Sequence, residues 1–158
     1  MRRKTLTETY VADSSVVIKW FKRGEAYEKE SLMLLGDVLV GKLTLILSEW
    51  TLLEVARGLK KSNYSAEKID KALYFLEELN NDGFIKVVPV SPYIAQAKDI
   101  IKELNLYASD AIHLAIAVKE HLTLISEDKH LLAEKVTRYS ENFSIRVMRL
   151  QALYNLTR

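Results

Sequence analysis

The stretch that decides the fold is residues 10–21, which read YVADSSVVIKWF. It opens on β-favouring residues, reaches an acid at Asp13, and continues through Ser14 and Ser15, either of which can cap a helix. The pattern predicts a short strand over residues 9–12 that is followed at once by a helix over residues 14–21. Asp13 would then lie at the carboxyl end of the strand.

The same change from a short strand to a helix recurs along the chain. Further strands are predicted over residues 43–47, 84–90, 122–126 and 144–148, and helices over residues 27–40, 49–61, 65–80, 93–104 and 109–121. Short strands that alternate with longer helices are typical of parallel sheets. We therefore expect an α/β fold of three layers (α/β/α), with a central parallel sheet of about four to five short strands flanked by helices on both faces.

Composition narrows the class of protein. The chain has 158 residues, 49% of them hydrophobic, which is enough for one domain with a substantial core. No linker-like segment interrupts it, so we expect a single domain over residues 1–158, with its core at 8–148 and terminal extensions at 1–7 and 149–158. The absence of cysteine removes disulfides, thiolate metal sites and cysteine nucleophiles. The net charge of +2 gives no global argument for nucleic-acid binding.

No signal peptide or apolar stretch long enough to span a membrane is recognisable in the sequence. We therefore expect a soluble, cytoplasmic protein that does not act at a membrane.

Four acids fall where such a sheet would gather them. Asp13 and Asp128 follow predicted strands, Glu54 lies within the apolar residues 52–56, and Asp110 begins an apolar helix. The ligand crevice of a parallel sheet lies outside the carboxyl ends of its strands. Helix capping, a first-turn position and a surface loop are alternative explanations for the three aspartates, whereas Glu54 is costly to bury unpaired. Carboxylates that share a crevice need protons or a cation, and oxygen ligands suit Mg²⁺ or Mn²⁺.

The chain resembles PIN domains over residues 10–148, in particular the VapC-type toxins of toxin–antitoxin pairs. Four segments carry the resemblance: residues 10–21, residues 53–59 (LEVARGL), residues 107–115 (YASDAIHLA) and residues 124–129 (LISEDK). Two positions depart from the family pattern. Ser48 stands where Pro is frequent, and Ser126 stands where Thr is usual. Serine retains the hydroxyl at 126 and can cap the helix at 48.

The resemblance implies a metal-dependent endoribonuclease that cleaves single-stranded or loop RNA with an activated water and leaves 5′-phosphate and 3′-hydroxyl ends. It assigns catalysis and the binding of one or two Mg²⁺ or Mn²⁺ ions to Asp13, Glu54, Asp110 and Asp128, with Ser14, Ser15 and Ser126 as hydroxyl partners. The partners that it implies are an RNA substrate, a small cognate antitoxin protein and a second copy of the chain in a homodimer.

Basic residues follow three of the acidic segments, and Lys19, Arg57 and Lys129 are the candidates to contact RNA phosphates. Ordinary solvated helix surfaces are the alternative. A further basic group is Arg2-Arg3-Lys4.

Several other residues could have either a functional or a structural role. We expect His113 to be a buried structural residue rather than a group that orients a ligand. We expect His121 and His130 to be exposed, and Trp20 and Trp50 to pack in the core rather than stack on bases. The leucine-rich stripes at 32/35/39 and 69/73/76/79 are expected in the core or an interface. Glu127 could exchange roles with Asp128.

Two other functions compete with the nuclease. A catalytically silent PIN-like module would bind RNA or a protein partner, but it has no need of four mutually repelling acids. A phosphatase with Asp13 as its nucleophile would usually have a second aspartate two residues later, where this chain has Ser15.

Overall fold

The central sheet of the computed structural model, which describes residues 7–154, has five strands. These are β1 (Glu8–Ala12), β2 (Leu43–Ser48), β3 (Ile85–Val88), β4 (Leu124–Ile125) and β5 (Val147–Met148). Their order is β3-β2-β1-β4-β5, and every neighbouring pair is parallel. β1 thus occupies the centre of the sheet. The parallel α/β/α arrangement expected from the alternating pattern is confirmed.

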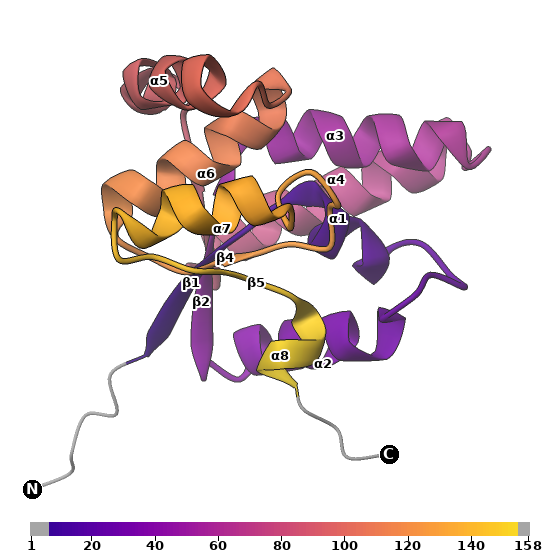
Figure 1. The fold of residues 1–158 in the computed structure, drawn as a ribbon. Helices are drawn as coiled ribbons and strands as arrows, with labels where there is room; N and C mark the ends of the chain where they lie inside the picture. The colour runs from indigo at the N-terminus through magenta and orange to yellow at the C-terminus, as the bar shows by residue number, and fades with distance from the viewer. Residues whose placement is uncertain (1–6, 155–158) are drawn as a thin grey trace, which may run out of the picture.

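Helices cover the sheet on both faces (Figure 1). One face packs against α5 (Ile94–Leu104), α6 (Ala108–Glu120) and α7 (Glu134–Glu141). The other packs against α1 (Ser14–Val17), α2 (Glu28–Leu39), α3 (Glu49–Lys61), α4 (Ala66–Asn81) and α8 (Leu150–Leu153). Two short 3-10 turns, η1 (Ile18–Trp20) and η2 (Ser91–Tyr93), precede α2 and α5.

The alternation of side chains along β1 divides the core into two clusters. Val11 belongs to the cluster under α5, α6 and α7, and the next residue, Ala12, belongs to the cluster on the opposite face. Both are fully buried, as expected for a central parallel strand with helices on either side. Asp13 therefore leaves the sheet at the middle of the molecule rather than at an edge.

The local signals for helix boundaries are largely correct. Ser48 caps α3, since its Oγ accepts a hydrogen bond from the Trp50 amide at 3.1 Å. Ser65 caps α4 in the same way. Gly83, with a φ of +81°, follows the end of α4, as its place in a stop signal indicates.

The leucine stripe at 32/35/39 lies beside the side of α2 that faces the core, and its exposed members remain candidates for an interface. Leu32 and Leu39 are exposed, whereas Ser31, Leu34 and Val38 are buried. Ser31 takes a core position because both of its polar groups are satisfied there: its Oγ donates to the Val16 carbonyl, and its own carbonyl accepts from the Trp20 ring. A pattern of apolar residues alone does not reveal a buried serine.

Three further expectations are corrected. Residues 14–21 form α1 and η1 rather than one helix. Trp50 is 38% exposed, because Thr51, Val55 and Leu59 form the buried side of α3. His130 is half-buried rather than exposed, whereas Trp20 is buried and His121 is exposed as expected.

The carboxyl-terminal part of the chain holds two helices that the sequence did not suggest, α7 and α8. Leu150 in α8 is fully buried in the cluster that contains α2 and α3. The packed core therefore continues beyond residue 148, and residues 149–154 are not a simple extension. The basic group Arg2-Arg3-Lys4 lies outside the described residues.

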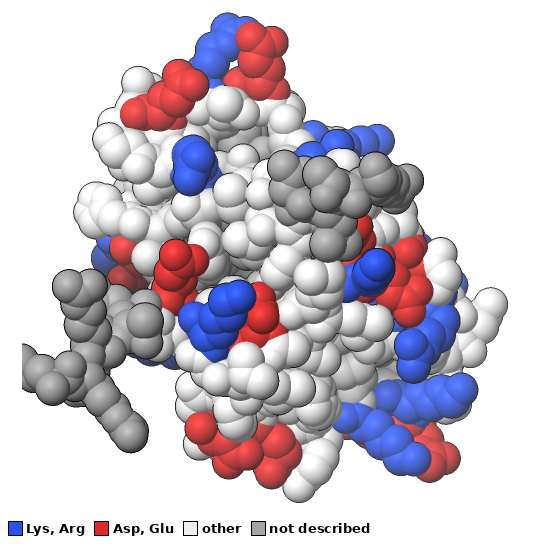
Figure 2. Space-filling model, turned by 90° about the horizontal axis from the view of Figure 1, so that it is seen from below, with Lys and Arg blue, Asp and Glu red and all other residues white. Residues whose placement is uncertain are grey.

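Within residues 7–154, no helix is both long and apolar enough to cross a membrane. Charged side chains of both signs are interspersed on the lower face of the molecule (Figure 2), and the described surface seen there forms no continuous basic field.

Candidate active site

The four acids line a single cleft of about 490 Å³ at the carboxyl end of β1. Each comes from a different part of the fold. Asp13 follows β1, Glu54 lies on α3, Asp110 lies in the first turn of α6, and Asp128 lies in the loop after β4. The parallel sheet thus brings together residues that are up to 115 positions apart (128 − 13). Ser14, Ser15, Arg57 and Gly58 also line the cleft.

Asp13 is held rigidly at the base of this cleft. Its side chain accepts hydrogen bonds from Ser15 Oγ at 2.5 Å and from Ser126 Oγ at 2.6 Å. It does not cap α1 with its side chain, although it occupies the N-cap position. Burial raises the pKa of Asp13, while the charge of His113 and the two hydroxyl donors act in the opposite direction. A buried carboxylate with a raised pKa is a group that a cation would stabilise.

The two serines that bind Asp13 also fix the loop after β4, which carries Asp128. In Figure 1 this loop lies beside α1. Ser15 Oγ accepts a hydrogen bond from the Glu127 amide at 2.9 Å, and Ser126 Oγ accepts one from the Asp128 amide at 3.0 Å. Asp128 in turn accepts from the His130 amide at 2.7 Å. Ser15 and Ser126 therefore couple the two strand ends. Ser14 lines the cleft without taking part in this network.

The opposite side of the cleft is formed by α3 and α6. His113 lies one turn after Asp110, is buried, and its Nε2 is 2.8 Å from Glu54 Oε1. Burial opposes the charged form of His113, but the Glu54 contact and the charges of Asp13 and Asp110 outweigh it and raise the histidine pKa. Protonated Nε2 then donates to Glu54. His113 is buried as expected, yet it also orients an acid of the cleft, the alternative that the sequence left open.

Asp110 has the pKa best suited to respond to a cation. Burial, followed by the charge of Asp128, raises the pKa of Asp110 to about 7, although His113 lowers it in part. The carboxyl is therefore close to half-protonated near neutral pH. Binding of a divalent ion would displace that proton.

The donor set fits a hard divalent cation, but the side chains are not yet gathered around one. In residues 7–154, no three His, Asp or Glu side chains form a compact cluster that could hold a metal ion. Both Asp13 oxygens are bonded to serines, and Glu54 is turned to His113. Oxygen donors alone suit Mg²⁺ or Mn²⁺. His113 contacts Oε1 of Glu54, so Oε2 of this side chain, which is 28% exposed, remains to bind an ion.

Two sequence candidates lie away from this chemistry. Lys19 is only 7% exposed and its Nζ is 3.9 Å from a Glu25 carboxylate oxygen, so it is not placed to meet RNA. Glu127 accepts the Leu150 amide at 2.8 Å and contacts Arg149, so it holds the start of α8 rather than replacing Asp128. Arg57 is exposed at the acidic cleft, and Lys129 is exposed in a neighbouring pocket.

Gly58 is a cleft residue that the sequence did not single out as functional. A Cβ at this position would lie 2.3 Å from the end of the Ile18 side chain. A larger residue here would therefore require the flexible end of the Ile18 side chain to move aside. The place of Gly58 within the 53–59 segment was the only signal that could have found it.

Comparison with known proteins agrees with this architecture. The family model of the PIN domain matches residues 10–136, which include all four acids. Among curated proteins, no sequence matches the chain significantly.

Several solved structures share the fold. A toxin–antitoxin complex from Klebsiella pneumoniae is 23% identical, covers 79% of this chain and 92% of its own, and has a TM-score of 0.57. VapC20 of Mycobacterium tuberculosis, a toxin that cleaves the sarcin–ricin loop, is 15% identical, covers 76% and 90%, and has a TM-score of 0.61. VapBC2 of Rickettsia felis, bound to a DNA fragment from its promoter, is 14% identical, covers 89% and 98%, and has a TM-score of 0.54.

Proposed function

Because the chain belongs to the PIN domain family, we propose that it is a metal-dependent endoribonuclease, the toxin of a VapBC-like toxin–antitoxin pair. The observation that carries this proposal is the convergence of Asp13, Glu54, Asp110 and Asp128, from four separate elements, on one cleft. Structural similarity to toxin–antitoxin complexes and to an RNA-cleaving toxin supports the choice of substrate class.

In this proposal the four acids would hold one or two Mg²⁺ or Mn²⁺ ions. When bound, such an ion activates water for attack on a phosphodiester and stabilises charge on the phosphate. Asp13 provides the fixed point, since two serine hydroxyls hold its carboxylate at the end of the central strand. His113 holds one oxygen of Glu54 and leaves the other to the ion. Arg57, exposed at the mouth of the cleft, is placed to contact a phosphate.

The proposed partners follow from the same relationship. A small antitoxin would cover the cleft and block it, and the protein would act on RNA in the cytoplasm. The assembly would be a homodimer, for which the exposed Leu32, Leu39 and Val40 at α2 offer an apolar surface.

RNA cleavage by the purified protein tests the proposal. Single-stranded RNA should be cut in the presence of Mn²⁺ and left intact in EDTA, and Asp13→Asn should abolish cutting while the fold is retained. Asp70→Asn is a matched control, since Asp70 is an exposed acid on α4 outside the cleft. If the wild-type protein neither cuts RNA nor melts at a higher temperature with Mn²⁺, it is the catalytically silent module instead.

A further inference from the structure

A second pocket, of about 450 Å³, lies beside the acidic cleft and has the opposite charge. Its lining includes Tyr107, Lys129, His130 and Lys135, and no acid contributes to it. Neither the four carboxylates nor their serine and histidine partners form part of this lining. The pocket is therefore not explained by the proposed catalytic residues.

Short chain segments connect the pocket to the cleft. Lys129 and His130 directly follow Asp128, and Tyr107 lies three residues before Asp110. The His130 amide donates to the Asp128 carboxylate at 2.7 Å, which ties the backbone of one site to an acid of the other. A strand of nucleic acid bound at the cleft would therefore pass close to the pocket.

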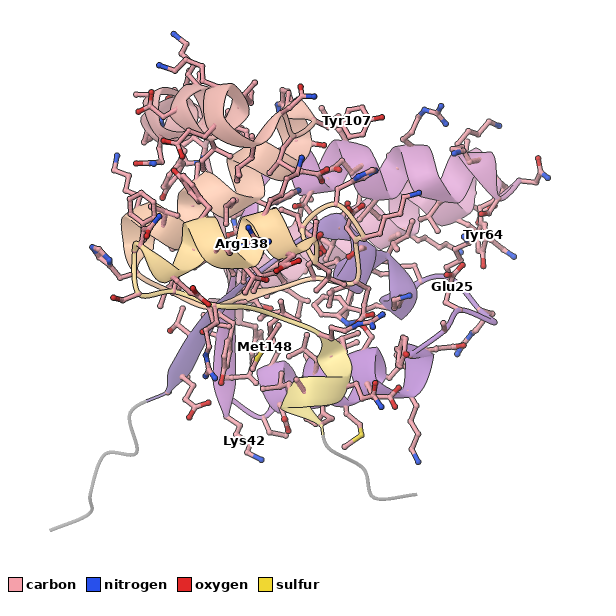
Figure 3. The ribbon with its side chains drawn as sticks, in the orientation of Figure 1. Glu25, Lys42, Tyr64, Tyr107, Arg138 and Met148 are labelled. Atoms are coloured by element: carbon pink, nitrogen blue, oxygen red, sulfur yellow. The ribbon has the colours of Figure 1, made fainter. Side chains whose placement is uncertain are left out.

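Tyr107 presents an aromatic ring to solvent. The residue is 69% exposed, and Figure 3 shows it at the surface, at the end of the molecule opposite Lys42. Its ring meets that of His130 edge to face, with centroids 5.3 Å apart and an interplanar angle of 72°. His130 thus limits the positions of the tyrosine ring while most of the ring remains accessible.

The lysines of the pocket lack acidic partners. Salt bridges in the described residues involve seven lysines and arginines, namely Lys19, Lys22, Arg23, Lys71, Lys102, Arg138 and Arg149, and most of the lysines and arginines have no such partner. Over residues 7–154, Lys129 and Lys135 form no such pair. Lys135 donates to the Leu104 carbonyl at 2.5 Å, which positions its ammonium group and leaves two of its three donors. The positive charge of the pocket is therefore open to an external anion.

We propose that this pocket is a subsite for one unpaired nucleotide of single-stranded RNA, with Tyr107 stacking on the base and Lys129 and Lys135 contacting its phosphate. An aromatic ring beside free cations is the usual means of binding single strands. An acidic peptide would use the lysines but not the ring, and a duplex offers no unstacked base. The inference rests on the proposed function, because it assumes that RNA reaches the acidic cleft.

Binding measurements without divalent metal isolate the subsite from catalysis. The probe is a fluorescent single-stranded RNA of about 12 nucleotides, with an abasic strand of equal length as its reference, and the readout is anisotropy in EDTA at several salt concentrations. The variants are Tyr107→Ala, Tyr107→Phe and Lys129→Ala. The controls are Tyr74→Ala, another exposed tyrosine, and Lys42→Ala, a lysine at the opposite end of the molecule (Figure 3).

Base and phosphate contacts should have different signatures. Tyr107→Ala should weaken binding of the normal strand about tenfold, leave binding of the abasic strand unchanged, and leave the salt dependence unchanged, whereas Tyr107→Phe should bind as wild type. Lys129→Ala should weaken binding of both strands and reduce the slope of log affinity against log salt by about 0.7. The two control variants should bind as wild type.

The proposal is overturned if Tyr107→Ala binds RNA as tightly as Tyr74→Ala, or if it weakens binding of the normal and abasic strands equally. Cleavage of the same RNA with Mn²⁺ separates this proposal from the proposed function. If the wild type cleaves while the Tyr107 and Lys129 variants bind as wild type, only the subsite is wrong. If the binding signatures appear but the wild type does not cleave, the subsite stands and the nuclease assignment fails.

Discussion

The strand side and the helix side of the acidic cleft hold their carboxylates in different ways. On the strand side, Asp13 is only 2% exposed and receives two serine hydroxyls, which also bind the backbone of the Asp128 loop. On the helix side, Glu54 is partly exposed, and His113 is its one hydrogen-bond partner among residues 7–154. Asp13 and the Asp128 loop are therefore held in place before any ion binds, whereas the Glu54 side chain can move when a cation arrives.

The partners of the two acids also differ in charge. Neutral hydroxyls serve Asp13, while a buried histidine with a raised pKa serves Glu54. Together with the partly protonated Asp110, His113 offsets the mutual repulsion of the acids before any ion is bound. The cleft is thus balanced by protons without metal, and a divalent ion would take over that role.

The largest expected effect is on the rate of RNA cleavage, and it should differ between the strand side and the helix side of the cleft. Asp13→Asn should reduce RNA cleavage about 10³-fold or more, because it removes the fixed carboxylate on which the site is built. Glu54→Gln should cost less, about 10- to 100-fold, since three carboxylates remain and the amide oxygen can still bind the ion. Single-turnover rates with saturating Mn²⁺ provide the measurement. Equal losses, or a greater loss for Glu54→Gln, would show that the helix side is the rigid one.

The next effect concerns stability. His113→Ala should lower the free energy of unfolding by about 2 kcal/mol, between the values for exposed and buried ion pairs, because Glu54 loses its partner and a cavity forms. His113→Gln, which restores a donor to Glu54, should recover part of the loss. Urea denaturation in EDTA measures both variants. A destabilisation below about 0.5 kcal/mol for His113→Ala would mean that this contact contributes little.

The pH dependence of stability tests the balance of protons. In the folded protein the pKa of Asp110 is about 7, against 3.8 in the unfolded chain, so folding retains a proton that the unfolded chain releases. Stability from this group is present below about pH 4 and is lost as the pH rises to about 7. The raised pKa of His113 acts in the same direction, since its contribution is lost as the pH rises through the folded-state value.

Melting temperatures measured at about pH 5 and about pH 8 test this pH dependence of stability. Without metal, the melting temperature should fall as the pH rises. With Mn²⁺ it should rise relative to EDTA, and by more at the higher pH, because the ion competes with protons for the carboxylates. A metal-free protein that is more stable at the higher pH, or an Mn²⁺ effect independent of pH, would contradict the assigned direction of these shifts.

The smallest effect contrasts two adjacent serines. Ser15→Ala should slow cleavage about tenfold, since Ser15 donates to Asp13 and accepts from the Glu127 amide. Ser14→Ala should cost less, because Ser14 lines the cleft but is not bonded to Asp13. Cleavage rates at matched Mn²⁺ concentration decide between them. A greater loss of cleavage rate for Ser14→Ala would show that Ser14, and not Ser15, carries the important hydroxyl.

The sequence was sufficient for features that follow from strand direction. Asp13 comes directly after an apolar strand and Asp128 shortly after another, and parallel strands end at the same edge of a sheet, so their proximity could be expected. Ser48 could be assigned as a helix cap for a similar reason, since capping depends on residues close in sequence. Glu54 and Asp110 could be noticed as acids next to apolar residues, and the family resemblance supplied their role as metal-site carboxylates.

The remaining features depend on contacts between distant segments. The pairing of Glu54 with His113 joins residues 59 positions apart. Lys19 is polar, yet it is buried against the core, and Leu150 lies beyond the apparent end of the domain but is buried within it. Burial of a single lysine, serine or leucine is decided by tertiary packing, for which the local pattern of apolar residues carries no signal.

Anomalous diffraction from crystals of the wild-type protein grown with Mn²⁺ tests the central claim most directly, since it locates the ion relative to each carboxylate. We expect a manganese peak in the cleft lined by Asp13, Glu54, Asp110 and Asp128, with Asp13 and Glu54 among its ligands. A cleft without manganese at saturating concentration, or manganese bound only elsewhere on the protein, would contradict the assignment of these acids as a metal centre.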